Sequence, residues 1–135
     1  MRNILSIPIL ALVIVAYNIF GATGSQIEAD SLVLDWALPS GAAVFFKAGD
    51  IFVVAGLVAL FFEILKAARA STSIILDHML STATFVVALI EFILVPFCGT
   101  VAFFLIMVMT LIDVVAGFSV SILGARHDFS VNDGQ

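Results

Sequence analysis

Apolar residues form long runs in this chain, and four of the runs have the length of a helix that crosses a lipid bilayer. The runs cover residues 4–22, 51–68, 74–95 and 100–123. A hydrocarbon core about 30 Å thick requires roughly 20 apolar residues in helical conformation, so each run predicts one membrane span. We therefore expect a single-domain, all-α membrane protein built as a four-helix transmembrane bundle.

Polar residues in the run 74–95 recur at helical spacing. At about 100° per residue they fall on one line along the helix, while Ile, Leu, Val and Phe occupy the other faces. The line consists of Asp77, Ser81, Thr84, Ala88 and Glu91. Because lipid offers no partners for acids, this face is predicted to point into the bundle.

The second and fourth runs also place small residues around an acid. Glu63 shares a helix face with Gly56 and Ala59, and Asp113 shares a face with Gly117. Small residues permit close contact between helices in lipid, so both faces are predicted to be packing faces.

Two short segments separate the last three runs. The connection at residues 70–73 is short enough to predict that the second and third spans are antiparallel neighbours. Residues 96–99 begin with a proline and end with a glycine. They are predicted to break an apolar region that would otherwise be too long for one span.

The first run has two interpretations. Arg2 ahead of it and small residues after it suit a cleaved signal peptide, but the run exceeds the roughly 7 to 15 apolar residues of a signal core. We expect the run to be retained as a first helix. Pro8 is tolerated if this helix begins near Ser6 and kinks the helix otherwise.

The segment 23–50 is polar and acidic. Within it, residues 32–38 alternate between large apolar and other side chains, the Pro-Ser-Gly triplet 39–41 supplies turn chemistry, and a short apolar run, 42–46, follows. This pattern predicts an extracytoplasmic β-hairpin. The alternative is a short helix in the membrane interface, with its aromatic residues at headgroup depth. In either form we expect the loop to fold back over one end of the bundle, because its apolar side chains would otherwise stand in water.

Basic residues predict the orientation. With the N-terminus inside, four basic residues are cytoplasmic and Lys47 alone is outside. The cytoplasmic set is Arg2, Lys66, Arg69 and Arg126. We expect both termini in the cytoplasm of a bacterial inner membrane, with a mostly disordered polar tail at 124–135. Cleavage of the first run would leave the other spans in the same orientation.

Composition agrees with a membrane location and excludes other classes. Hydrophobic residues make up 63% of the chain, charged residues 11%, and the mean hydropathy is +1.27, which no soluble domain of this length has. There is no basic patch for nucleic acid. Cys98 is the only cysteine and cannot form an intrachain disulfide. Without a cofactor motif or regular ligand spacing, we expect no cofactor and no metal.

Acids inside the apolar runs are the candidates for function. An Asp at the centre of a membrane helix costs about 2.5 to 3.5 kcal/mol on insertion, so each acid needs a reason. The acids are Glu91, Asp113, Glu63 and Asp77, and the possible charge partners are Lys66, Arg69, His78 and Arg126. A structural network of ion pairs and hydrogen bonds accounts for most of them, and a proton or cation path is the alternative. Glu91 fits the network least, because its plausible donors are Tyr17, Asn18 and Lys47.

Three segments carry a resemblance. They are FFEILKAARASTSIILDH, FVVALIEFILVPF and FFLIMVMTLIDVVAGFSVSILGARHDF, and they lie in the last two thirds of the chain. This region resembles small four-span inner-membrane proteins of proteobacteria that have no assigned activity. The resemblance implies the same fold and location and assigns no functional residue.

Two functions fit these observations. We expect a non-enzymatic accessory or scaffold protein that packs against itself or a larger membrane complex through its small-residue faces. The alternative is a proton- or cation-coupled transporter or channel, which must be oligomeric because four helices with few polar positions cannot line a wide pore. Ser81 lies one turn from Asp77 and His78, but serine is common at helix contacts in membranes, so we expect no catalysis.

Overall fold

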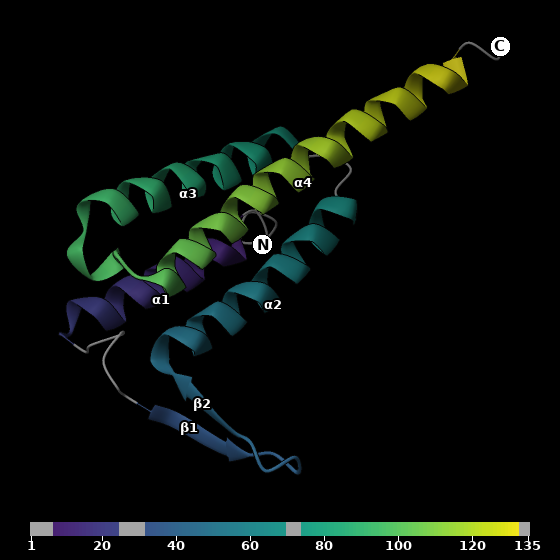
Figure 1. Ribbon diagram of the computed structural model, residues 1–135. Helices are drawn as coiled ribbons and strands as arrows, with labels where there is room; N and C mark the ends of the chain where they lie inside the picture. Colours follow the sequence, from purple (N-terminus) through teal and green to yellow (C-terminus); the bar gives the residue numbers. More distant parts are fainter. Residues whose placement is uncertain (1–6, 25–31, 70–73, 133–135) are drawn as a thin grey trace.

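The chain is mostly helical, with one small sheet. The computed structural model describes residues 7–24, 32–69 and 74–132. In these ranges it contains α1 (Ile9–Ala22), β1 (Leu32–Ala37), β2 (Ala43–Lys47), α2 (Ala48–Arg69), α3 (Ile74–Leu94), the short 3₁₀ helix η2 (Pro96–Cys98) and α4 (Val101–Asn132) (Figure 1). Among the described helices, α2, α3 and α4 are long and apolar enough to cross a membrane, which suggests membrane association.

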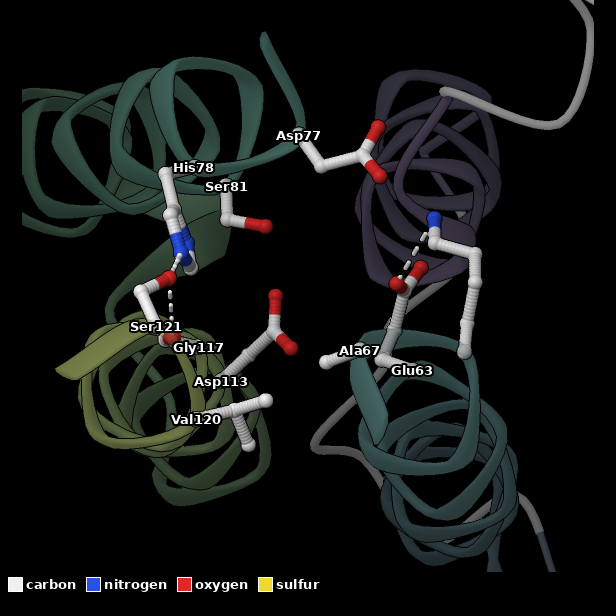
Figure 2. A pocket seen from close by; sticks show the side chains of 10 residues that line it. Glu63, Ala67, Asp77, His78, Ser81, Asp113, Gly117, Val120 and Ser121 are labelled. Carbon is white, nitrogen blue, oxygen red and sulfur yellow. Dashed lines mark hydrogen bonds and ion pairs between the residues drawn. The ribbon is translucent and has the colours of Figure 1, made fainter. Parts of the chain in front are cut away.

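The four α-helices lie side by side, in the order α1, α2, α4, α3 around a common centre (Figures 1 and 2). Helix α4 packs extensively on both α2 and α3, and α1 packs mainly on α2. Helices α2 and α3 are diagonally opposite and make little direct contact, so the prediction that they are adjacent was wrong. The acidic faces of both helices point toward the centre of the bundle. There they face the small residues and Asp113 of α4.

Helix α1 begins later than the apolar run that contains it. Its first residue is Ile9, and Pro8 stands at the N-cap position with extended backbone (φ −61°, ψ 128°). Proline disfavours helical conformation in the residue before it, which explains a start at this point. The predicted start at residue 4 lies outside the described residues. The helix spans 14 residues, fewer than the apolar run predicted.

The hydrophobic core lies where α1 meets the other helices. Tyr17 is fully buried, and its ring packs on Phe52 of α2 and Phe103 of α4 at centroid distances of 5.2 and 5.0 Å. A second group joins Leu10 of α1 to Ala59 and its neighbours in α2. Helix α1 is therefore an integral part of the packed structure.

The predicted inward face of α3 is confirmed. Ala88 is fully buried, while Met79 on the opposite side is 64% exposed. The packing faces of α2 and α4 are also buried, at Gly56, Glu63, Asp113 and Gly117 among others. Helical spacing alone thus located the side of each helix that faces its neighbours.

The predicted β-hairpin is also confirmed. Strands β1 and β2 pair antiparallel, with Trp36 opposite Val44 and Leu34 opposite Phe46. Gly41 adopts φ +84° in the turn, a conformation that side chains disfavour. The hairpin does not fold back over the helices as predicted. Among the described elements its main helix contact is with α2, and it extends away from the other helices (Figure 1).

The connection between α3 and α4 follows the prediction, but the end of α4 does not. Pro96 opens the short helix η2, which interrupts the two long helices. Helix α4 then continues to Asn132, past the predicted end at residue 123, so a disordered tail from residue 124 was wrong. Gly124 costs a helix only about 1 kcal/mol, and no proline follows it.

Candidate functional site

Polar side chains meet in the middle of the four helices, around a small cavity (Figure 2). The residues that line it are Glu63, Lys66, Ala67, Asp77, His78, Ser81, Asp113, Gly117, Val120 and Ser121. We call the seven polar members of this set the interior cluster. The cavity measures about 30 Å³, room for about two water molecules.

The interior cluster brings together most of the residues that the sequence singled out. Glu63 and Lys66 come from α2, Asp77 and His78 from α3, and Asp113 from α4. They meet near the end of the structure where α1 and α3 begin and α2 ends (Figure 1). Three of the four candidate acids therefore share one site.

Glu63 has a structural role that its sequence context only partly indicated. Its side chain is 2% exposed, and Lys66 Nζ lies 3.0 Å from Oε2, as the i, i+3 spacing suggested. The other oxygen, Oε1, accepts a hydrogen bond from the backbone N–H of Ile9. Ile9 is the first residue of α1, and Pro8 provides no side-chain cap. Glu63 therefore caps α1 from a different helix, and its charge is balanced by Lys66 and by the positive end of the α1 dipole.

Asp113 is buried with a weaker set of partners. It is 7% exposed, and the nearby Ser81 hydroxyl of α3 favours its carboxylate but adds no positive charge. Lys66 and His78 also act favourably on it, but Lys66 is already paired with Glu63, whose negative charge opposes them. The charge of Asp113 is thus poorly balanced.

The negative charge of Asp77 is also poorly balanced by its neighbours. Its Oδ1 is buried and has no hydrogen-bond partner within the part of the chain that the structure describes. The side chain points from α3 into the space that α1 and α2 close on the far side (Figure 2). With one lysine already paired, the interior cluster holds more carboxylates than cations.

His78 ties α3 to α4. Its Nε2 lies 2.5 Å from Ser121 Oγ, and its ring stacks on Phe118 at 5.1 Å. Ser121 Oγ also donates to the Gly117 carbonyl at 3.1 Å, an arrangement that fits the tautomer of His78 with its proton on Nε2. A side chain at position 117 would overlap the imidazole, so a glycine is required there.

Glu91 lies apart from the interior cluster, at the other end of α3. Asn18 Nδ2 donates to Glu91 Oε2 at 2.9 Å, which confirms one of the predicted donors. Asn18 Oδ1 accepts from Cys98 Sγ at 3.4 Å, and Tyr17 Oη lies 2.5 Å from Thr100 Oγ1. These contacts form an outer cluster that holds the C-terminal half of α1.

Cys98 is an inert thiol. It is fully buried beside the outer cluster. Burial, and secondly the nearby charge of Glu91, raise its pKa to about 11. Since the thiolate is the reactive form, Cys98 is not a candidate nucleophile.

Arg69, another predicted partner, does not line the interior cluster. Arg69 is exposed at the end of α2, and the side chain of Arg126 lies outside the described part of the chain. Within the described residues, no group of three or more His, Cys, Asp and Glu side chains is placed to hold a metal ion.

Comparisons with known proteins leave the family open. No family model matches the chain, and no curated protein and no solved structure is detectably similar to it. The resemblance to four-span inner-membrane proteins therefore stays a prediction. The fold and the site together define a helical protein with three segments able to cross a membrane and an excess of acid between them.

Proposed function

We propose that this chain is an integral membrane protein that takes up and releases a proton at Asp113 in the interior cluster. The observation that supports it is the excess of buried carboxylates over cations around a cavity of about 30 Å³. Moving an unbalanced carboxylate from water into a low-dielectric interior costs several kcal/mol. A proton removes that cost with the smallest structural change.

Geometry favours a proton over other counter-ions. A multivalent metal ion needs several ligands converging on one point, and the described residues offer no such group. The cavity holds about two water molecules and has no room for an organic solute. Because no organic solute fits in the cavity, we expect proton uptake to drive or gate transport at another place. That place lies between copies of this chain or between the chain and a partner. The Ser121 hydroxyl donates its hydrogen bond to the Gly117 carbonyl. This agrees with a non-enzymatic role, because the hydroxyl is not then arranged as a nucleophile.

The membrane arrangement that we propose has four spans. Helices α2, α3 and α4 each cross a bacterial inner membrane, and the shorter apolar helix α1 forms the fourth span. Both termini are cytoplasmic, as the basic residues indicate. Topology reporters fused after Ala68 and after Gln135 should then be cytoplasmic, and a reporter at Ser40 should be external. A cytoplasmic reporter at Ser40 would invert the arrangement.

Asp113→Asn should abolish proton uptake without unfolding the protein. An amide keeps the size of the side chain and can still bond to Ser81, but it cannot exchange a proton. Infrared difference spectra during a pH titration in lipid vesicles detect the carbonyl band of a protonated carboxyl group. A pH-sensitive dye inside the vesicles reports proton flux. The variant should lose both the titrating band and the flux.

Glu91→Gln is the matched control. Glu91 is an acid of α3 that lies outside the interior cluster, and its carboxylate already has an amide partner, Asn18. This variant should keep the band and the flux. If the Asp113→Asn variant titrates and transports protons like the wild type, the proposed function is wrong.

A second candidate, an accessory role, is supported by the outer side of α3. Only 6% of the α3 span is buried, against 44% of α4. An apolar groove of about 630 Å³ runs between α3 and α4 past Ala83, Thr82 and Phe118. Small residues in such a groove admit a partner helix at short range. Purification in mild detergent separates the two candidates: a stoichiometric larger partner supports the accessory role, and a homo-oligomer with pH-dependent flux supports proton coupling.

A further inference from the structure

The hairpin has two chemically different faces. Cross-strand pairing places Leu34 with Phe46 and Trp36 with Val44. Because side chains alternate along a strand, these four share one face, which is entirely apolar. The opposite face carries Asp35, Ala37, Ala43, Phe45 and Lys47. The hairpin is therefore amphipathic, and we call the first of these surfaces the apolar face.

Much of the apolar face is exposed in the described chain. Trp36 is 63% exposed and Leu34 is 51% exposed, while Val44 and Phe46 are half-buried. The main contact of the hairpin with the described helices is that of β2 with α2. An isolated two-stranded hairpin is marginally stable in water, so a surface with this composition needs a partner to pack against.

The position of the hairpin identifies that partner. Lys47 ends β2, and the next residue, Ala48, begins α2. Asp50 in the first turn of α2 accepts a hydrogen bond from the Lys47 backbone N–H at 2.9 Å, which fixes the junction. Where α2 enters the membrane, the base of the hairpin must lie at the membrane surface. The hairpin leaves this junction at an angle to the axis of α2 and extends away from the other helices (Figure 1).

We infer that the hairpin lies on the outer surface of the bilayer and that its apolar face binds the lipid headgroup region, with Trp36 as the main anchor. Tryptophan prefers this depth because its ring is apolar and its N–H is polar. Asp35 and Lys47 on the opposite face then remain in water. This inference rests on the proposed crossing of the membrane by α2 and is independent of proton binding.

Trp36 is the only tryptophan in the chain, so its fluorescence tests the inference directly. The full-length protein is placed in vesicles of phosphatidylcholine and phosphatidylglycerol, and quenching by acrylamide in water is compared with quenching by lipids brominated high on the acyl chain. Trp36 should lose most of its emission to the brominated lipid, be shielded from acrylamide, and emit at shorter wavelength than free tryptophan. Strong acrylamide quenching without lipid quenching would overturn the inference. Shielding from both quenchers would also overturn it, because a protein surface would then cover the face.

A relocated tryptophan is the matched control. The double variant Trp36→Phe/Ala43→Trp keeps one tryptophan and moves it to the opposite face, where acrylamide should quench it more strongly than it quenches Trp36. Equal lipid quenching at both positions would overturn the assignment of the faces. Alkaline extraction of the same vesicles tests the membrane crossing separately, since a protein that remains in the membrane but leaves Trp36 in water contradicts only the hairpin. The Asp113→Asn variant should give the wild-type Trp36 result, so the two proposals fail independently.

Discussion

Glu63→Leu should be among the most destabilising single substitutions in this chain. It removes the partner of Lys66 and the acceptor of the Ile9 N–H in one step. Breaking a buried ion pair from one side costs about 3 to 5 kcal/mol, and loss of a helix cap adds about 1 kcal/mol. Because the Lys66 side chain is 23% exposed and can reach toward water, the lower end of that range is expected. Thermal unfolding in mild detergent measures the loss.

A double variant separates the charge from the cap. Glu63→Leu/Lys66→Met removes both charges, so it should recover most of the stability and retain only the cost of the uncapped α1. Glu63→Gln keeps an acceptor for Ile9 and should be intermediate. If all three variants unfold at the wild-type temperature, Glu63 does not link α1 to α2.

Tyr17→Ala should destabilise the protein to a similar degree, for a different reason. Tyr17 is fully buried and is the largest such side chain among the described residues, packed on two phenylalanine rings. Truncation of a large buried aromatic costs about 3 to 5 kcal/mol, because a cavity remains. The same unfolding assay measures it.

Two variants control for this effect. Tyr17→Phe keeps the ring and leaves Thr100 without the hydroxyl at 2.5 Å, so it should cost about 1 to 3 kcal/mol. Val15→Ala changes a residue of the same helix that is 53% exposed and should have almost no effect. Equal losses for Tyr17→Ala and Val15→Ala would show that α1 does not pack as described.

Local pattern was sufficient to predict the elements and their inward faces. Helical spacing identified the buried side of α3, and alternation with a Pro-Ser-Gly turn identified the hairpin. Both signals arise within one element, where geometry is fixed by the backbone. The same logic gave the Glu63–Lys66 pair, because residues three apart are neighbours on a helix.

Relations between elements could not be predicted in the same way. The bond from Glu63 to Ile9 joins residues 54 positions apart, and no spacing rule connects them. The diagonal placement of α2 and α3 depends on how α4 fits between them, although the short connection favoured direct contact. The course of the hairpin away from the helices depends on what lies around the protein, and that environment is not encoded in the alternation of its residues.

The contacts of α1 have a consequence for how the protein is made. A ribosome delivers α1 first, yet the groups that hold it arrive much later: Glu63 for its N-terminus, then Glu91 and Thr100 for Asn18 and Tyr17. Until Glu91 and Thr100 are synthesised, Asn18 and Tyr17 lack these bonds, although the α2 side chains Phe52 and Ala59 are already available for packing. Helix α1 can therefore pack on α2 early in synthesis, but a nascent chain stalled before Thr100 should hold its C-terminal half less tightly than the folded protein does.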